Sequence, residues 1–167
     1  MLNDKQVLYA YDFVGYWKDV GTIESLWEAN MDLLESPMPI DMHDKKWRIF
    51  AKNPGMPPHY IADGATVTDT LITEGCEVYG KVNHSILFAG VIIEEGADVE
   101  YSVIMPGSII RRGAVVRRTI VAENAVVSAG AVVGENEGNI AVIGQGVTVP
   151  AGVSVGAGQQ VDENTEF

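Results

Sequence analysis

The chain has 167 residues, of which 47% are hydrophobic and 20% charged, as in a globular protein that can bury one core. Its formal net charge of −12 argues against a nucleic-acid surface and against docking on anionic membranes, because both depend on Lys and Arg. No apolar run reaches the roughly 18 residues of a membrane span, and no signal peptide is recognisable. A single cysteine, Cys76, cannot form an intrachain disulfide, which fits a cytoplasmic protein.

Residues 1–35 are predicted to form one strand and one helix. The aromatic, alternating segment 7–17 is typical of an edge strand. Thr22 is expected to cap a helix whose apolar positions recur on one face, and Ser36-Pro37 to end it. The apolar positions of this face are Ile23, Leu26, Trp27, Met31 and Leu34. Because one strand and one helix cannot bury a core, we expect this segment to pack on the rest of the chain or on a further domain.

Residues 36–60 are predicted to be a linker, since they hold five of the seven prolines. Little regular structure is expected there beyond a short strand at 47–50. Trp47 within that strand is expected to pin the linker to the domain that follows.

Residues 61–167 contain an internal repeat. Lines of 17 residues beginning at Asn83, Glu100 and Arg117 match column by column, so that similar residues recur at equivalent positions. A shorter line, 70–82, precedes them, and a further line, 143–155, follows after the insertion 134–139 at an offset of 22. The aligned residues include Ser85, Ser102 and Thr119; Ile86, Val103 and Ile120; Gly96, Gly113 and Gly130; and Ala97, Ala114 and Ala131.

So short a period with many Val and Ile residues predicts stacked coils of parallel β-strand. Each line is one rung, and about five rungs are expected. Branched side chains fill the interior, and small residues fit the corners. The period itself leaves the hand of the coil open.

Four of the five arginines lie within eight residues: Arg111, Arg112, Arg117 and Arg118. A shift of 17 places Arg111 and Arg112 over Glu94 and Glu95, and Arg117 over Glu100, which predicts a ladder of ion pairs between rungs. The same cluster could instead hold a phosphate. Both roles are compatible.

Histidine and cysteine point to no catalytic centre. Only His84 of the three histidines lies in the rungs, so neither a three-histidine metal site nor an acyltransferase site is favoured. Cys76 aligns with small interior positions and is expected in the core.

The segment Gly15–Thr22, G-Y-W-K-D-V-G-T, holds Asp19 in a glycine turn before the helix. Pieces such as I-A-D-G-A-T and V-V-S-A-G-A-V-V-G also resemble the hexapeptide repeats of left-handed β-helices. Together with the proline-rich linker and S-V-I-M-P-G, these motifs closely resemble the C-terminal part of bacterial glucose-1-phosphate adenylyltransferases, over nearly the whole chain. The left hand rests on this resemblance alone, since crossovers are ordinarily right-handed.

The resemblance implies that residues 1–35 end a nucleotidyltransferase domain, that 36–60 link it to a β-helix, and that 61–167 form that β-helix. It implies that Asp19 is a catalytic Mg²⁺ ligand, and that the second metal ligand, the nucleotide loop and the sugar-phosphate lysine belong to an upstream domain. The substrates would be ATP and glucose 1-phosphate, the pathway glycogen biosynthesis, and the assembly a homo-oligomer, tetrameric in the family. Arg117 and Arg118 would bind an allosteric phosphorylated metabolite or AMP.

This chain by itself is expected to be inactive and to bind no Mg²⁺, since one carboxylate holds Mg²⁺ poorly. Two alternatives stay open. One is another sugar-nucleotide pyrophosphorylase, and the other is a β-helix scaffold that catalyses nothing.

Overall fold

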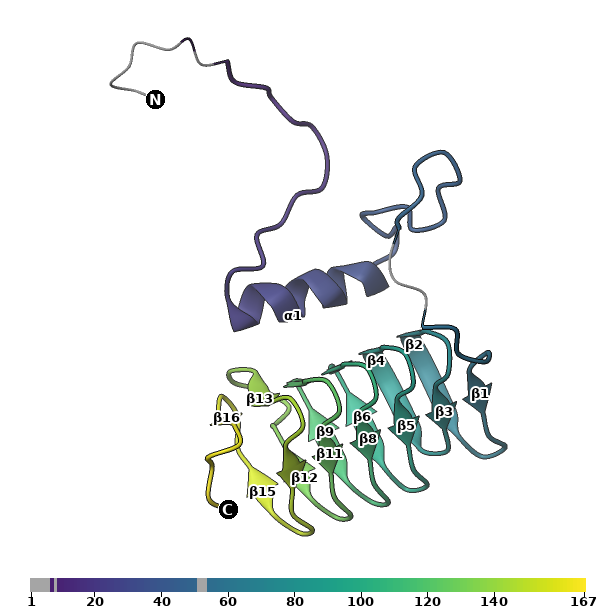
Figure 1. The fold of residues 1–167 in the computed structure, drawn as a ribbon, viewed down its shortest axis with the longest axis vertical. Helices are drawn as coiled ribbons and strands as arrows, with labels where there is room; N and C mark the ends of the chain where they lie inside the picture. The colour runs from purple at the N-terminus through teal and green to yellow at the C-terminus, as the bar shows by residue number, and fades with distance from the viewer. Residues whose placement is uncertain (1–6, 8, 51–53) are drawn as a thin grey trace.

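The repeated lines stack as turns of a parallel β-helix in a computed structural model of the chain, which describes residue 7, residues 9–50 and residues 54–167. The turns follow one another along the axis of the stack, and the helix α1 lies beside them (Figure 1). Every strand pairing in the described residues is parallel, with a register of 17 over the central lines and 22 across the insertion. The stacked arrangement that the repeat predicts is therefore confirmed.

Three faces surround the interior. The first is a six-stranded sheet, one strand more than the five rungs predicted, and consists of β1 (Tyr60–Ile61), β3 (Glu77–Val78), β5 (Ile92–Ile93), β8 (Ile109–Ile110), β11 (Val126–Val127) and β14 (Thr148–Val149). The second holds β6 (Asp98–Glu100), β9 (Val115–Arg117), β12 (Val132–Val133) and β15 (Ser154–Val155). The third holds β7 (Val103–Ile104), β10 (Thr119–Val121), β13 (Ala141–Ile143) and β16 (Gln160–Val161). The long strands β2 (Thr66–Ile72) and β4 (Lys81–Leu87) join the second and third faces into one sheet.

The interior is built from columns of aliphatic side chains, because every turn places the same strand position inward. One column runs through Val82, Val99, Val116, Val133 and Val155, and another through Leu87, Ile104, Val121, Ile143 and Val161. Each fully buried side chain of this size contributes about 1.5–3 kcal/mol. Cys76 lies in the same core, as predicted, and burial raises the pKa of its thiol.

The predicted helix is confirmed as α1 (Ile23–Met31), followed by the 3₁₀ turn η2 (Asp32–Leu34). Thr22 is its N-cap, and Thr22 and Ser25 each accept a hydrogen bond from the other's backbone N–H. The apolar side of α1 packs on the outer side of the third face, over Ile86, Val103, Ile120 and Ile140. Of the two possibilities open from the sequence, the helix thus packs on its own β-helix.

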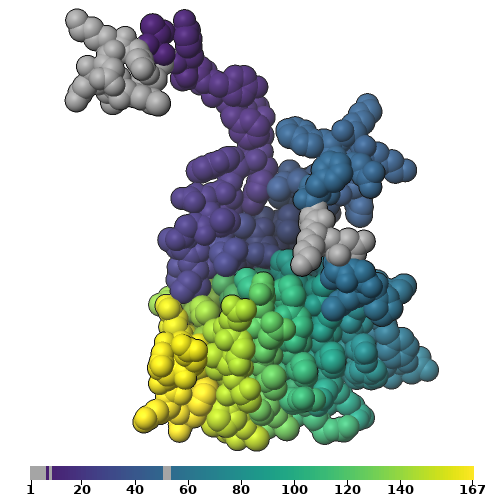
Figure 2. Space-filling model, viewed as in Figure 1, coloured from purple at the N-terminus to yellow at the C-terminus, as the bar shows by residue number. Residues whose placement is uncertain are grey.

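The two short strands predicted outside the repeat are wrong. The described residues of 7–17 form no strand, and Tyr9 and Val14 are 93% and 95% exposed, because no neighbouring strand supplies a ladder there. Residues 47–50 also form no strand, and Trp47 is 84% exposed, so it does not pin the linker. Both segments project from the side of the molecule that carries α1 (Figure 2).

Candidate functional site

Asp19 lies in an exposed turn that leads directly into the N-cap of α1. One of its carboxylate oxygens, Oδ1, accepts a hydrogen bond from the backbone N–H of Gly21 at 3.2 Å. No group of three or more His, Cys, Asp or Glu side chains able to hold a metal occurs in the described part of the chain. Asp19 therefore offers one hard oxygen ligand of the kind Mg²⁺ prefers, outside any such group of three in the described residues.

Residues just before Asp19 are tied to the far end of the helix. The Tyr16 hydroxyl and the Lys18 ammonium both donate to Oδ2 of Asp32, at 2.7 and 2.8 Å. Lys18 also lies 3.2 Å from a carboxylate oxygen of Glu28. Sequence reasoning missed these contacts; the acidic pair at positions 28 and 32, one helical turn apart, was the available signal.

Ion pairs between turns form the predicted ladder. Arg111 contacts Glu94 at 2.6 Å and Arg112 contacts Glu95 at 2.7 Å. The hydrogen bond from Arg111 holds the pKa of Glu94 below its usual range. The ladder interpretation of these arginines is therefore confirmed.

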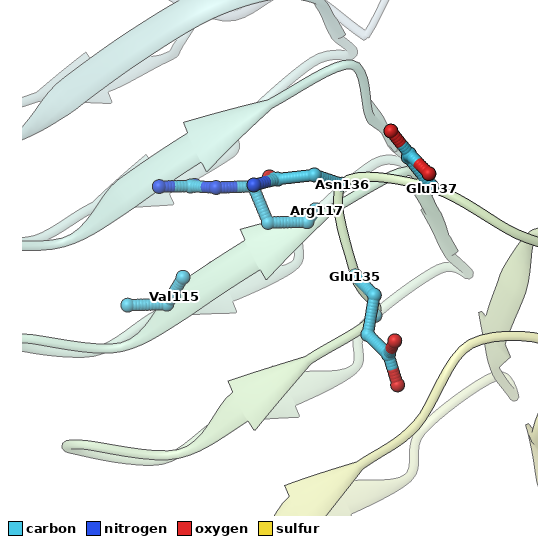
Figure 3. Close-up of a pocket in the computed structure, with 6 residues that line it drawn as sticks. Val115, Arg117, Glu135, Asn136 and Glu137 are labelled. Carbon is cyan, nitrogen blue, oxygen red and sulfur yellow. The ribbon is translucent and has the colours of Figure 1, made fainter.

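Arg117 and Arg118 engage different partners on different sides of the β-helix. Arg117 lies on the second face, where its guanidinium contacts the Asp98 carboxylate at 2.5 Å and approaches Glu100 at 3.7 Å. It borders an open hollow of about 580 Å³ beside the insertion, and its side chain points away from Glu135 and Glu137 (Figure 3). A phosphate bound by Arg117 would have to displace the carboxylates of Asp98 and Glu100.

Arg118 turns toward α1 instead. Its guanidinium lies 4.7 Å from the ring centre of Trp27 and donates to the carbonyl oxygen of Gly138 at 3.3 Å. Its Nε atom is buried and has no hydrogen-bond partner among the described residues. Trp27 in turn donates its indole N–H to the carbonyl oxygen of Tyr101 at 2.8 Å. The structure thus joins Arg118 to the helix that begins beside Asp19, a link that sequence reasoning missed.

Arg118 belongs to a corner column with left-handed backbone conformation. Asp69, His84, Tyr101 and Arg118 occupy equivalent places in successive turns, with φ between 43° and 49°. The His84 ring bonds Asp69 at 2.5 Å and packs against the Tyr101 ring at 4.6 Å between centres. These contacts give His84 a structural role at the corner.

Comparison with known structures first supports the fold. A variant of perosamine N-acetyltransferase from Caulobacter crescentus, in complex with CoA and GDP-perosamine, matches with a TM-score of 0.53. The match covers 59% of this chain and 48% of that protein at 15% identity, so it bears on architecture alone. The family model described as GlmU-like, C-terminal hexapeptide, matches residues 59–140. The predicted class, a left-handed parallel β-helix of hexapeptide repeats, is confirmed.

Comparison with sequences then places the opening segment. The family model described as Nucleotidyl transferase matches residues 1–36, which include Asp19. Glucose-1-phosphate adenylyltransferases from Bacillus mycoides, Bacillus cereus and Bacillus anthracis are each 53% identical over 104 residues. Over these residues the chain is similar to glucose-1-phosphate adenylyltransferase.

Similarity to these adenylyltransferases covers 62% of this chain but only 28% of each relative's length. The chain thus combines a nucleotidyl transferase segment with a hexapeptide β-helix, as the resemblance of its motifs predicted. Within the described residues, no helix is both long and apolar enough to span a membrane.

Proposed function

We propose that this chain is the C-terminal part of an enzyme that forms ADP-glucose and pyrophosphate from ATP and glucose 1-phosphate in glycogen biosynthesis, in the cytoplasm. The proposal rests chiefly on two matches that agree with each other. The nucleotidyl transferase match ends at residue 36 and contains Asp19, in a chain 53% identical to glucose-1-phosphate adenylyltransferases over 104 residues. Residues 1–35 would close the catalytic domain, 36–60 would link it, and 61–167 would be the β-helix domain.

In the proposed reaction, a phosphate oxygen of glucose 1-phosphate attacks the α-phosphorus of ATP. The bond between the α-phosphorus and the bridging oxygen to the β-phosphate breaks, and pyrophosphate leaves with that oxygen. A Mg²⁺ ion would offset the negative charge on the reacting phosphates. Asp19 would supply one ligand to it through its exposed carboxylate, and an upstream domain would supply the rest. The chain by itself is proposed to be inactive.

The β-helix would serve assembly and regulation. Its first and last turns leave strand edges unpaired in the described residues, which suits association of several copies. Binding of a phosphorylated effector would involve Arg117 and Arg118. Arg118 is the better placed of the two to transmit such binding, because it alone touches α1.

Substitution of Asp19 by Asn in the polypeptide extended upstream by its nucleotidyl transferase domain tests the proposal. Pyrophosphate release from ATP and glucose 1-phosphate with Mg²⁺ is measured for both proteins. We expect Asp19→Asn to lower kcat at least about 10²-fold, because a Mg²⁺ ligand is lost. Full activity of Asp19→Asn would leave Asp19 as a turn former only. If the native protein releases no pyrophosphate, the scaffold alternative gains support.

A second candidate is another sugar-nucleotide pyrophosphorylase, which is favoured by the generic nucleotidyl transferase match and the GlmU-like description of the β-helix. The same assay with GTP, UTP, CTP or dTTP in place of ATP separates the two. A higher kcat/KM with any of these nucleotides would replace the adenylyltransferase proposal.

A further inference from the structure

The Asp32 carboxylate gathers two side chains from the segment before Asp19. Tyr16 and Lys18 both donate to its Oδ2 atom, at 2.7 and 2.8 Å, across sequence separations of 16 and 14 residues. Asp32 itself directly follows the last residue of α1. The three residues therefore tie the approach to the Asp19 turn onto the C-terminal end of the helix.

These contacts are better shielded than an ordinary surface ion pair. The side chains of Lys18 and Asp32 are 24% and 29% exposed, whereas those of Arg112 and Glu95 are 70% and 71% exposed. The hydrogen bond with Lys18 holds the pKa of Asp32 below its usual range, and Asp32 raises the pKa of Lys18. A hydrogen bond between an ammonium and a carboxylate is stronger than one between neutral groups.

Asp19 is held from both directions. On its N-terminal side, the next residue is Lys18, which is fixed to Asp32. On its C-terminal side, Gly21 bonds the Asp19 carboxylate and Thr22 begins the cap of α1. The helix is in turn anchored on the β-helix by its apolar face and by Trp27. The chain is therefore held on both sides of Asp19, by Asp32 before it and by the cap of α1 after it.

We propose that Asp32 is a positioning residue which, through Tyr16 and Lys18, forms a clamp that fixes the Asp19 carboxylate relative to α1 and the β-helix. The catalytic part of this inference rests on the proposed function, in which Asp19 binds the metal. The structural part, that the clamp orders the turn, does not.

The structural part is tested on the 167-residue chain by backbone ¹⁵N relaxation. We expect Asp32→Ala to lower the order parameters of residues 18–21 from about 0.85 to below about 0.6, because the turn loses its hold on α1. Lys18→Met removes the contact between Lys18 and Asp32 by changing the other partner, and it should give the same result. It replaces Asp32→Ala in the experiment if that variant folds poorly. Glu95→Ala deletes a carboxylate from an exposed ion pair and is the matched control. Unchanged order parameters in both clamp variants would overturn the proposal.

The catalytic part is tested in the polypeptide extended by its upstream domain. Substitution of a residue that orients a metal ligand without touching the metal typically lowers metal affinity or activity by about 10–100-fold. We expect Asp32→Ala to raise the Mg²⁺ concentration for half-maximal activity by about that factor, with the KM for glucose 1-phosphate unchanged. Lys18→Met should give a shift in the same direction, and the two substitutions should not be additive in the double variant, because both remove the contact between Lys18 and Asp32.

The outcomes separate the two proposals. An active enzyme whose Mg²⁺ requirement is the same in native and Asp32→Ala protein overturns the positioning role while the proposed function stands. A native enzyme that makes no ADP-glucose removes the proposed function, and the relaxation experiment then decides alone whether the clamp exists.

Discussion

Single hydroxyl groups complete the hydrogen bonding at one corner of the β-helix. Ser85, Ser102 and Thr119 are fully buried, and each of the first two accepts the backbone N–H of the residue one turn on, at 3.1 and 3.2 Å. Each hydroxyl also donates to the carbonyl oxygen two residues earlier in its own turn. The hydroxyls thereby supply hydrogen-bond partners to the corner backbone, which bends into the left-handed region just before each of them.

Substitution of Ser102 by Ala removes the acceptor for the Thr119 N–H and the donor to the Glu100 carbonyl oxygen. We expect the free energy of unfolding to fall by about 1–3 kcal/mol, because buried polar groups lose their partners. Urea denaturation followed by circular dichroism measures it. Ser154→Ala, at an exposed position of β15, should change stability by less than about 0.5 kcal/mol. Equal effects at the two sites would contradict a special role for the buried hydroxyl.

The residues that sequence reasoning located well are those repeated along the chain. A shift of 17 brings Ser102 over Ser85 and Arg111 over Glu94, because each turn repeats the backbone path of the one before. The contact of Lys18 with Asp32 has no such repeat. It depends on the direction in which the chain approaches α1, which residue types and spacing do not determine. The roles of Asp19, Arg117 and Arg118 in catalysis and regulation stay predictions.

At the scale of elements, α1 shows how an amphipathic helix finds a partner. Its cap and its apolar periodicity were readable from the sequence because both are local. The face it covers is the outward side of β4, β7 and β10, where Ile86, Val103 and Ile120 form an apolar stripe. The segment 7–17 alternates as a strand would, but a strand also needs a neighbour, and alternation does not supply one.

Met31 is the most deeply buried side chain of α1, and it packs on this apolar stripe. We expect Met31→Ala to lower the free energy of opening of α1 by about 2 kcal/mol, because a buried thioether side chain is lost. Amide hydrogen exchange resolves this, and the protection of interior strands such as β8 should be unchanged. Met42→Ala, at an exposed linker position, is the control. Loss of protection throughout the β-helix would show that α1 does not open separately.

For the whole molecule, stability lies in the interior columns, because each turn contacts only the turns before and after it. Removing one large side chain opens a cavity between three turns. We expect Ile104→Ala, within the column from Leu87 to Val161, to cost about 2–5 kcal/mol in urea denaturation. Ile61→Ala, at an exposed side chain in the first coil, should lower the free energy of unfolding by less than half as much. Similar losses at both positions would mean that burial in the columns is not what stabilises the fold.

A stack of turns tends to fray from its ends, one coil at a time, since neighbouring coils are joined mainly by their own ladder. The nine residues of α1 extend about 14 Å at about 1.5 Å per residue, close to three spacings of about 4.8 Å between coils. The helix lies along the stack (Figure 1) and touches Ile86, Val103, Ile120 and Ile140, which belong to four consecutive coils. The helix therefore links four coils to one another in addition to their strand pairing. While α1 stays in place, no single coil beneath it can separate from its neighbours without also breaking its contact with the helix.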